Sequence, residues 1–356
     1  MKKIFFVISL LIMVVMLNGC SDQNDIKPPI KEPNPPQETK QPLTIEDYFA
    51  YKENTYYAYE GEGNEYASYN VIVDYISGSR VQIRTNNGGT EMVRVIENKE
   101  GELTQLLARG ECYFREDLTN LIHSPSNQAE IVLKEPLEIG TSWVLPDGRN
   151  RSITNVEVDI TTPLGSYKTL EVTTEGEDSK IQDYYAPNIG LVKSVFTSDG
   201  YVVTSSLSKL ENDVPLIQTV QFYYPNINDF KIYSINNKLS FKTNDITRIK
   251  FEKAFKELPK RDDLYKLLGP NVKIKSLYLN KDNMVYVDFS KELVSEMNAG
   301  AGYEGMILQS ITNTLGNYYG VDRVYLTVED SPYESGHYMM KKGEFFTVDL
   351  KNIVEL

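Results

Sequence analysis

The sequence has very few of the side chains that build metal and redox sites. Its 356 residues include two histidines and two cysteines. Zinc fingers, iron–sulfur clusters and disulfide-rich scaffolds all need more ligands than this, and neither histidine has a partner at helical spacing. We therefore expect no metal and no cofactor.

Basic charge is also scarce. The chain carries 37 Lys and Arg against 50 Asp and Glu, which gives a formal net charge of −13. Such a chain repels phosphate backbones, so we expect no nucleic-acid partner. The hydrophobic share of 41% is sufficient for folded cores, and the length predicts about two domains.

Residues 1–19 have the pattern of a targeting signal. Lys2-Lys3 precede the apolar stretch Ile4–Leu17, which is shorter than the about 20 residues of a membrane span. It ends in Leu17-Asn18-Gly19-Cys20, which resembles the lipobox of bacterial lipoproteins. The resemblance implies cleavage before Cys20, a diacylglyceryl thioether on its sulfur and an acyl group such as palmitate on the new amine. An ordinary secretory signal with an incidental cysteine is the alternative.

Residues 20–43 are polar and rich in proline. Such segments are extended spacers, so we predict a tether that reaches roughly 70 Å from the lipid. Two or more acyl chains hold a protein stably on a membrane. The predicted location is therefore the extracytoplasmic face of a cell membrane, with a lipid anchor at Cys20.

Residues 44–212 contain short β-branched and aromatic segments separated by turn residues. This pattern predicts an antiparallel β domain, either sandwich-like or an open half-barrel. Asn86-Asn87-Gly88-Gly89 and Ser198-Asp199-Gly200 predict hairpin turns. The expected strands are 69–75, 81–84, 92–96, 153–160, 168–173, 181–185, 191–196 and 201–205.

Two stretches of this region, residues 163–172 and 184–193, look like a pattern of bacterial envelope β domains. Those domains are similar to curved half-barrels that carry lipids or lipoproteins. The resemblance is compatible with a ligand cavity. The alternative is that Gly165 and Gly190 are turn glycines and that the aromatic residues fill one face of a sheet.

Residues 213–350 alternate strand and helix patterns and precede a short tail, residues 351–356. We predict an α+β domain with two helices packed on one mixed sheet. The expected strands are 219–225, 274–279, 284–289, 323–328 and an edge at 345–350. A further hairpin is expected from residues 232–235 and 239–243 across Asn236-Asn237.

Two apolar stripes mark the predicted helices. The first helix is expected to begin at a cap residue, Asn244 or Asp245, and to end at Pro259. The second lies between Gly302 and Gly320. Their predicted core faces are Ile246, Ile249, Ala254, Phe255 and Leu258 in the first, and Tyr303, Ile307, Ile311, Leu315 and Tyr318 in the second.

Five stretches of this region resemble the GerMN domain of bacterial sporulation and spore-germination proteins. They are residues 254–258, 285–290, 309–315, 318–324 and 333–337. The resemblance implies an extracytoplasmic role in assembly, a fold similar to ring-building modules of secretion-like complexes, and no catalytic residues. The family's germination protein carries two such domains in tandem, whereas this chain has one.

A polar and aromatic loop follows the last predicted main strand. It consists of Tyr333, Glu334, Ser335, Gly336 and His337. Loops on rigid scaffolds often carry function, so this loop is the first candidate for recognition of a partner. The alternative is that the loop folds over and seals the sheet.

Three further polar residues are candidates for interaction. Asp288 and Ser290 follow a predicted strand, where they either bind a partner or cap a short helix. Asn313 lies inside the second predicted helix, where asparagine is a poor helix former. It either marks an interface or bridges to a neighbouring loop while buried.

Catalytic patterns are weak in this sequence. Cys112 and His123 belong to no motif, and Cys112 is expected to be a small buried apolar residue. Glu60, Glu62 and Glu65 are expected on a solvated surface. We therefore expect no enzyme.

The function predicted from the sequence is that of a non-catalytic surface lipoprotein. It would mediate protein–protein interaction or assembly in the cell envelope, through its GerMN-like domain or by self-association, in sporulation or germination. The alternative is an envelope module that binds a lipid, a glycan or a peptidoglycan fragment with its β domain. An enzyme is the third hypothesis.

Overall fold

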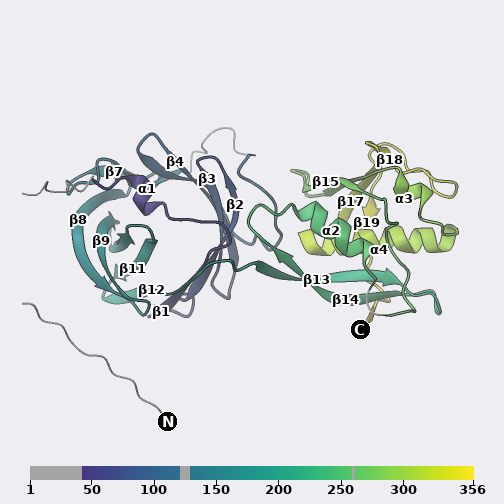
Figure 1. The fold of residues 1–356 in the computed structure, drawn as a ribbon, viewed down its shortest axis with the longest axis horizontal. Coiled ribbons are helices and arrows are strands. Elements are labelled where there is room, and N and C mark those ends of the chain that lie inside the picture. The colour runs from purple at the N-terminus through teal and green to yellow at the C-terminus, as the bar shows by residue number, and fades with distance from the viewer. Residues whose placement is uncertain (1–41, 121–128, 259–260) are drawn as a thin grey trace, which may run out of the picture. The chain divides into compact units, whose positions relative to one another are not determined.

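A nearly closed antiparallel sheet of twelve strands forms the first part of the fold (Figure 1). The computed structural model describes residues 42–120, 129–258 and 261–356. The predicted signal and tether, Cys20, His123 and Pro259 lie outside these residues. The strands are β1 Tyr56–Glu62, β2 Tyr69–Ser77, β3 Arg80–Asn86, β4 Glu91–Lys99, β5 Glu102–Arg109, β6 Glu130–Lys134, β7 Ser142–Val144, β8 Asn150–Thr161, β9 Ser166–Glu175, β10 Ser179–Ala186, β11 Gly190–Ser198 and β12 Tyr201–Glu211.

Strands that are neighbours in sequence pair with one another, except β6 and β7, and β1 also pairs with β12. The edges of the sheet are β6 and β7. The indole N–H of Trp143 in β7 donates to the carbonyl oxygen of Ile131 in β6 at 2.9 Å. This bond joins the two edges, so the sheet curves around its own apolar core.

The predicted hairpin turns are present in this sheet. Gly88 has a φ of +82° between β3 and β4, and Asp199 and Gly200 have positive φ values between β11 and β12. Gly190 also has a φ of +89°, whereas Gly165 does not lie in the left-handed region. Asn, Asp and Gly are the residues that adopt such backbone angles most readily.

A short helix, α1 Ile45–Tyr48, lies within the curve of the sheet (Figure 1). Ile45 and Tyr48 are buried in the core that the strands enclose. The backbone N–H of Ile45 donates to Glu135 Oε1 at 3.1 Å. The core of the curved sheet therefore includes the segment that directly precedes β1.

The remaining chain builds two smaller sheets and two longer helices. One sheet contains β13 Leu216–Pro225, β14 Ile232–Phe241 and β20 Val354–Glu355. The other contains β15 Ile274–Leu279, β16 Val285–Phe289, β17 Arg323–Val328, β18 Ser331–Pro332 and β19 Phe346–Thr347. The helices are α2 Thr247–Lys256, the short α3 Glu292–Ser295, and α4 Ala301–Tyr319.

Helix α4 packs against β13 of one sheet and β17 of the other (Figure 1). Its wholly buried residues Ile307, Ile311 and Leu315 have the predicted helical spacing. The helix ends at Gly320, which has a φ of 67° and satisfies the predicted stop. Both small sheets are mixed, because β14–β20 and β16–β17 are parallel pairs. The predicted fold class is confirmed, with two mixed sheets in place of one.

The hairpin predicted across Asn236-Asn237 is wrong. Residues 232–241 form one continuous strand, β14, in which Asn236 pairs with Gln221 and Asn237 with Val220. Asparagine favours turns, but the long partner strand β13 offers a full set of backbone hydrogen bonds. Pairing along the whole strand therefore outweighs the local preference.

The predicted start of α2 is also wrong. Its N-cap is Ile246, which provides no side-chain cap. Asn244 Oδ1 accepts instead from the backbone N–H of Ile76 at 2.8 Å, and Asp245 Oδ2 accepts from that of Lys242 at 2.7 Å. A tertiary contact therefore occupies the side chain of Asn244, and a local turn contact occupies that of Asp245.

The core face of α2 differs from the prediction too. The wholly buried side chains are Phe251 and Phe255, whereas Ile246, Ile249 and Leu258 are exposed. Within the described residues, no helix is both long and apolar enough to cross a membrane.

Candidate functional site

The predicted recognition loop is anchored by a buried carboxylate, Glu304, in the first turn of α4. Tyr333 is wholly buried and its hydroxyl donates to Glu304 Oε1 at 2.8 Å. Ser335 Oγ donates to the same oxygen at 2.5 Å, and His337 Nδ1 lies 2.6 Å from Oε2. The loop thus folds over, as the alternative interpretation predicts, but its side-chain hydrogen bonds hold it on the start of α4 and not on the sheet.

Burial alone raises the pKa of Glu304, but the hydrogen bonds from Ser335, His337 and Tyr333 outweigh it and lower the pKa. The carboxylate is therefore charged at neutral pH and holds the loop in place. Glu334, Gly336 and His337 remain exposed on the outside. Their role in recognition stays a prediction.

Glu304, Ser335 and His337 do not form a nucleophile–base pair. Ser335 Oγ donates to Glu304 and accepts from the backbone N–H groups of His337 at 3.0 Å and Tyr338 at 3.1 Å. Its hydrogen-bonding capacity is filled by these three partners. A nucleophilic serine would instead bond to the imidazole ring.

Asp288 and Ser290 join strands and do not cap a helix. Asp288 is buried, and its Oδ1 accepts from Thr327 Oγ1 at 2.6 Å and from the backbone N–H of Asp330 at 2.8 Å. Ser290 Oγ accepts from the backbone N–H of Lys273 at 2.9 Å. Helix α3 has Lys291 as its N-cap, without a side-chain cap. The capping interpretation is therefore wrong.

Asn313 is the buried bridge that one interpretation of the sequence predicts. It is wholly buried in α4. Its Nδ2 donates to the carbonyl oxygen of Asp349 at 2.6 Å, and its Oδ1 accepts from the backbone N–H of Asp349 at 2.9 Å. Gln309 Nε2 also donates to Asn313 Oδ1 at 2.8 Å. Asn313 thus fixes the C-terminal segment on α4.

An aromatic surface surrounds the first turn of α4, and we call it the α4-start surface. The rings of Phe230 and Tyr303 lie 4.7 Å apart, and those of Tyr265 and Tyr303 lie 5.4 Å apart. Phe230 packs on Gly302, where a Cβ would lie 2.8 Å from the ring. The members of the surface are Ile227, Phe230, Tyr265, Tyr303, Tyr338 and Met339.

Two members of the α4-start surface are strongly exposed. Phe230 is 57% exposed and Met339 is 74% exposed. Met339 follows the predicted recognition loop and pairs through an isolated β-bridge with Glu334. Tyr338, the neighbour of Met339 in the chain, donates to the carbonyl oxygen of Ala301 at 3.2 Å, so the loop and the aromatic residues both lie at the first turn of α4.

A buried arginine, Arg115, joins the curved sheet to the segment before α2. The guanidinium lies 4.0 Å from the centre of the Tyr75 ring and donates to the hydroxyl of Tyr75 at 2.7 Å. It also donates to the carbonyl oxygens of Asp74 at 2.7 Å and Lys242 at 3.1 Å, and to that of Asp245. Residues Leu43–Leu356 form one compact unit, and Arg115 is a central contact within it.

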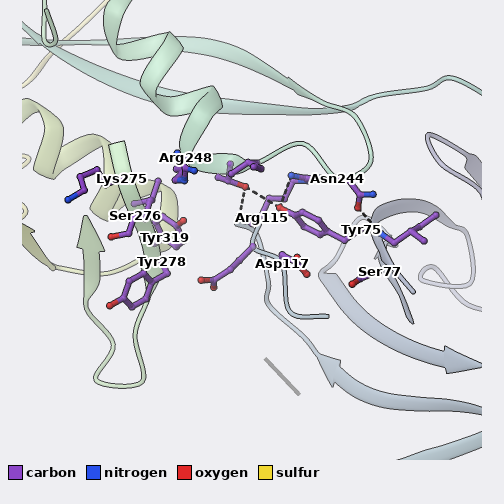
Figure 2. A pocket seen from close by; sticks show the side chains of 15 residues that line it. Tyr75, Ser77, Arg115, Asp117, Asn244, Arg248, Lys275, Ser276, Tyr278 and Tyr319 are labelled. Carbon is purple, nitrogen blue, oxygen red and sulfur yellow. Dashed lines mark hydrogen bonds between the residues drawn. The ribbon is translucent and has the colours of Figure 1, made fainter. Parts of the chain in front are cut away.

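A groove of about 530 Å³ lies beside Arg115. Figure 2 shows Tyr75, Arg115 and Asp117 on one side, and Lys275 and Tyr278 on the other. Glu116 also lines the groove, and burial raises its pKa to about 7. A carboxyl group that titrates near neutral pH makes the groove sensitive to pH.

Metal and thiol chemistry find little support in the described residues. No group of three or more His, Cys, Asp or Glu side chains there could hold a metal ion. Cys112 is buried, as predicted, and burial raises the pKa of its thiol. The exposed Glu60, Glu62 and Glu65 agree with the predicted solvated surface.

Sequence reasoning missed Arg115, Glu304 and Glu116. Arg115 and Glu304 are buried, and Glu116 half-buried, by segments far away in sequence, and no local pattern marks any of the three. Arg115 follows the aromatic Tyr113-Phe114, and Glu304 lies in an ordinary first helical turn. Their interaction partners are distant in sequence and lie beside them only in the folded structure.

The structure defines an α+β module behind a nearly closed antiparallel sheet. Residues 221–334 of that module match the Germane family, described as "Sporulation and spore germination". The chain therefore contains a domain of this family, and the GerMN resemblance predicted from the sequence is confirmed. No curated protein matches the chain in sequence.

Several solved structures are similar to parts of the chain. The tandem GerMN domains of the sporulation protein GerM from Bacillus subtilis share 18% identity, over 37% of this chain and 46% of that chain, with a TM-score of 0.30. A proposed lipoprotein from Clostridium perfringens shares 15% identity, over 37% of this chain and 87% of that chain, with a TM-score of 0.25. An exported protein with a YmcC-like fold from Bacteroides fragilis shares 12% identity, over 45% of this chain and 97% of that chain, with a TM-score of 0.26.

Proposed function

We propose that this protein is an extracytoplasmic lipoprotein of sporulation or spore germination. It is anchored through Cys20 and works by binding other envelope proteins through its Germane domain, without catalysing a reaction. The observation that carries the proposal is the family match over residues 221–334. The lipobox-like Leu17-Asn18-Gly19-Cys20 supports the anchor.

The α4-start surface supports a binding role for the Germane domain. Large apolar side chains such as Phe230 and Met339 are costly to leave in water, and exposed clusters of them commonly mark protein contacts. Aromatic residues and methionine are also enriched at the centres of interfaces. The partner surface that fits this cluster is apolar and belongs to another envelope protein.

The charged groups of the domain support the absence of catalysis. Asp288 and Glu304 are both bound by internal donors. Glu252 accepts from Lys256 at 2.7 Å, from Lys273 at 3.1 Å and from the backbone N–H of Ile274 at 3.0 Å. Carboxylates that serve as catalytic acids or bases must instead reach a substrate.

Site-specific photo-crosslinking in a spore-forming cell tests the proposal. A p-benzoyl-phenylalanine residue replaces Met339 in the full chain, and the matched control carries it at Val144, which is 69% exposed in β7. We expect discrete protein adducts from position 339 at a yield about tenfold above that of the control.

Equal yields at both positions, or no protein adduct at position 339, would contradict the binding role of this surface. A further variant, Phe230→Ser, keeps the crosslinker at position 339 and removes an exposed ring that packs on Tyr303 at the first turn of α4. It should reduce the adducts, because Phe230 contributes apolar area to the same contact.

A further inference from the structure

The interior of the curved sheet contains a second cavity, remote in sequence from the Germane domain. Its volume is about 400 Å³, within the range of about 300–1,000 Å³ that is typical of small-ligand sites. Strands β1 to β6, β8, β10 and β11 supply its lining. The cavity is therefore framed by nearly the whole sheet.

Tyrosine rings form much of this lining. The rings of Tyr59 and Tyr69 are stacked, with centres 4.4 Å apart and planes 18° apart. Tyr59 donates to the carbonyl oxygen of Leu191 at 2.8 Å. Among the described residues, the hydroxyls of Tyr51, Tyr69 and Tyr185 bond to no other protein group. The cavity thus offers flat aromatic faces together with free hydroxyl groups.

Charged groups of both signs converge on the same space. Arg151 is nearly buried and is held by Glu130 at 2.6 Å, Thr174 Oγ1 at 2.7 Å and the carbonyl oxygen of Ile131 at 2.9 Å. Asp183 Oδ1 accepts from Ser194 Oγ at 2.6 Å. Since these partners fix the side chains before any ligand arrives, the site is preorganised.

The cavity reaches the solvent beside Tyr66. This residue lies between β1 and β2, lines the cavity and is 52% exposed. Its ring packs on Gly89 in the turn between β3 and β4, where a Cβ would lie 2.7 Å from the ring. Asn87, in the same turn, also lines the cavity. A small molecule could enter past these two residues.

The lining discriminates between classes of ligand. A hydrocarbon chain would bury Arg94, Arg151, Glu130 and Asp183 against methylene groups, which is unfavourable for charged and polar atoms. A phosphate would meet two carboxyl groups as well as two guanidinium groups. A neutral ring with hydroxyl groups instead places its C–H face on tyrosine and its hydroxyls on these charged side chains.

We propose that this cavity binds a short neutral saccharide. Tyr69, supported from behind by the stacked ring of the buried Tyr59, supplies the stacking surface, and Asp183 and Arg94 bond to the sugar hydroxyls. This site goes beyond the proposed binding of envelope proteins, because it lies in the curved sheet and takes a small molecule.

Calorimetric titration of the full chain with four neutral disaccharides tests this inference. The probes are N,N′-diacetylchitobiose, cellobiose, maltose and lactose, and the detergent carries no sugar headgroup. We expect saturable binding of at least one probe. Tyr69→Ala and the nearly isosteric Asp183→Asn should each weaken it about tenfold or more. Tyr278→Ala, an exposed tyrosine outside the cavity, should leave it unchanged.

Two outcomes would overturn the inference. One is that none of the four disaccharides binds to the folded protein. The other is that palmitate binds saturably, with a loss in Tyr69→Ala, which would assign the cavity to an acyl chain. Thermal melting confirms that each variant is folded, and Asp183→Asn keeps the test valid should Tyr69→Ala fail to fold. Because no partner protein is present, failure here leaves the crosslinking test untouched.

Discussion

At the scale of single residues, buried carboxyl groups organise this molecule. Glu304 is held charged by three donors from one loop, whereas burial of Glu116 beside the groove favours its neutral form. The two residues therefore respond to pH in opposite directions. Hydrogen bonds that stabilise the charged form lower the pKa of Glu304, whereas at Glu116 burial outweighs the backbone hydrogen bond from Leu279 and raises the pKa.

Removal of one donor to Glu304 should destabilise the domain. In Tyr333→Phe the ring stays and the hydroxyl bond of 2.8 Å to Glu304 is lost. Hydrogen bonds to buried charges contribute about 2 kcal/mol, so the free energy of unfolding should fall by that amount. Urea denaturation measures it. The matched control is Tyr325→Phe in β17, whose ring packs on Tyr286, and an equal loss in the control would refute the role of Glu304.

The raised pKa of Glu116 predicts a pH dependence of stability. Its folded pKa of about 7 lies above the unfolded value, which is about 4.3. The neutral form therefore stabilises the fold below the unfolded pKa, and this contribution is lost as the pH rises through the folded pKa. Arg109 and Asp117 act on the same carboxyl in opposite directions.

Wild type and Glu116→Gln should therefore diverge as the pH rises from about 5 to 8. Relative to the variant, wild type should lose ~1–2 kcal/mol of unfolding free energy between about pH 5 and pH 8, after allowance for partial exposure. Chemical denaturation at a series of pH values measures the difference. Parallel pH profiles for the two proteins would show that Glu116 does not titrate in this range.

At the scale of elements, tertiary contacts decide what local patterns leave open. Helix α4 follows its predicted boundaries closely, because apolar spacing and Gly320 both mark it. Strand β14 differs from its prediction. The local sequence Asn236-Asn237 is typical of a turn, but β13 pairs with β14 along its whole length. Strands with clear turns at both ends were predictable, whereas pairing partners distant in sequence were not.

Four strands of the curved sheet, β1, β5, β6 and β7, were not predicted, and β1 and β5 were missed for different reasons. Strand β1 contains glutamates and Gly61, so its composition is that of a loop, yet it pairs with both β2 and β12. Strand β5 carries Leu103, Leu106 and Leu107 at spacings that suit a helix equally well. In both cases, pairing with neighbouring strands of the sheet determines the strand conformation, and the local sequence does not.

The bridge at Asn313 predicts local opening of the C-terminal segment. Asn313→Ala removes both bonds to the backbone of Asp349. The opening free energy of residues 346–349 should fall by about 2 kcal/mol, which corresponds to roughly 30-fold faster amide exchange. Hydrogen exchange measures it. The control Asn317→Ala lies on the exposed side of α4, and exchange rates equal to those of the control would exclude the bridge.

At the scale of the whole molecule, the two candidate sites lie in different parts of the fold. The α4-start surface belongs to the Germane domain, and the cavity proposed to bind a saccharide belongs to the curved sheet. The α+β class and the family were predictable from the sequence, because apolar periodicity and short motifs can be recognised in one sequence alone. The network around Arg115 was not, since its partners Tyr75, Asp74 and Lys242 come from distant segments.

The lipid at Cys20 should act through local concentration. Confinement of a binding domain to the partner's membrane raises the effective concentration of each for the other. A protein that works by weak contacts therefore depends on its anchor. The variant Cys20→Ser keeps every described residue and removes the sulfur that the predicted lipid needs.

The most direct test is the crosslinking yield from position 339 in wild type and in Cys20→Ser, with membrane fractions recorded in parallel. We predict that Cys20→Ser leaves the membrane fraction and loses the adducts about tenfold or more. A variant that stays on the membrane and yields the same adducts as wild type would contradict the account of an anchored binding protein.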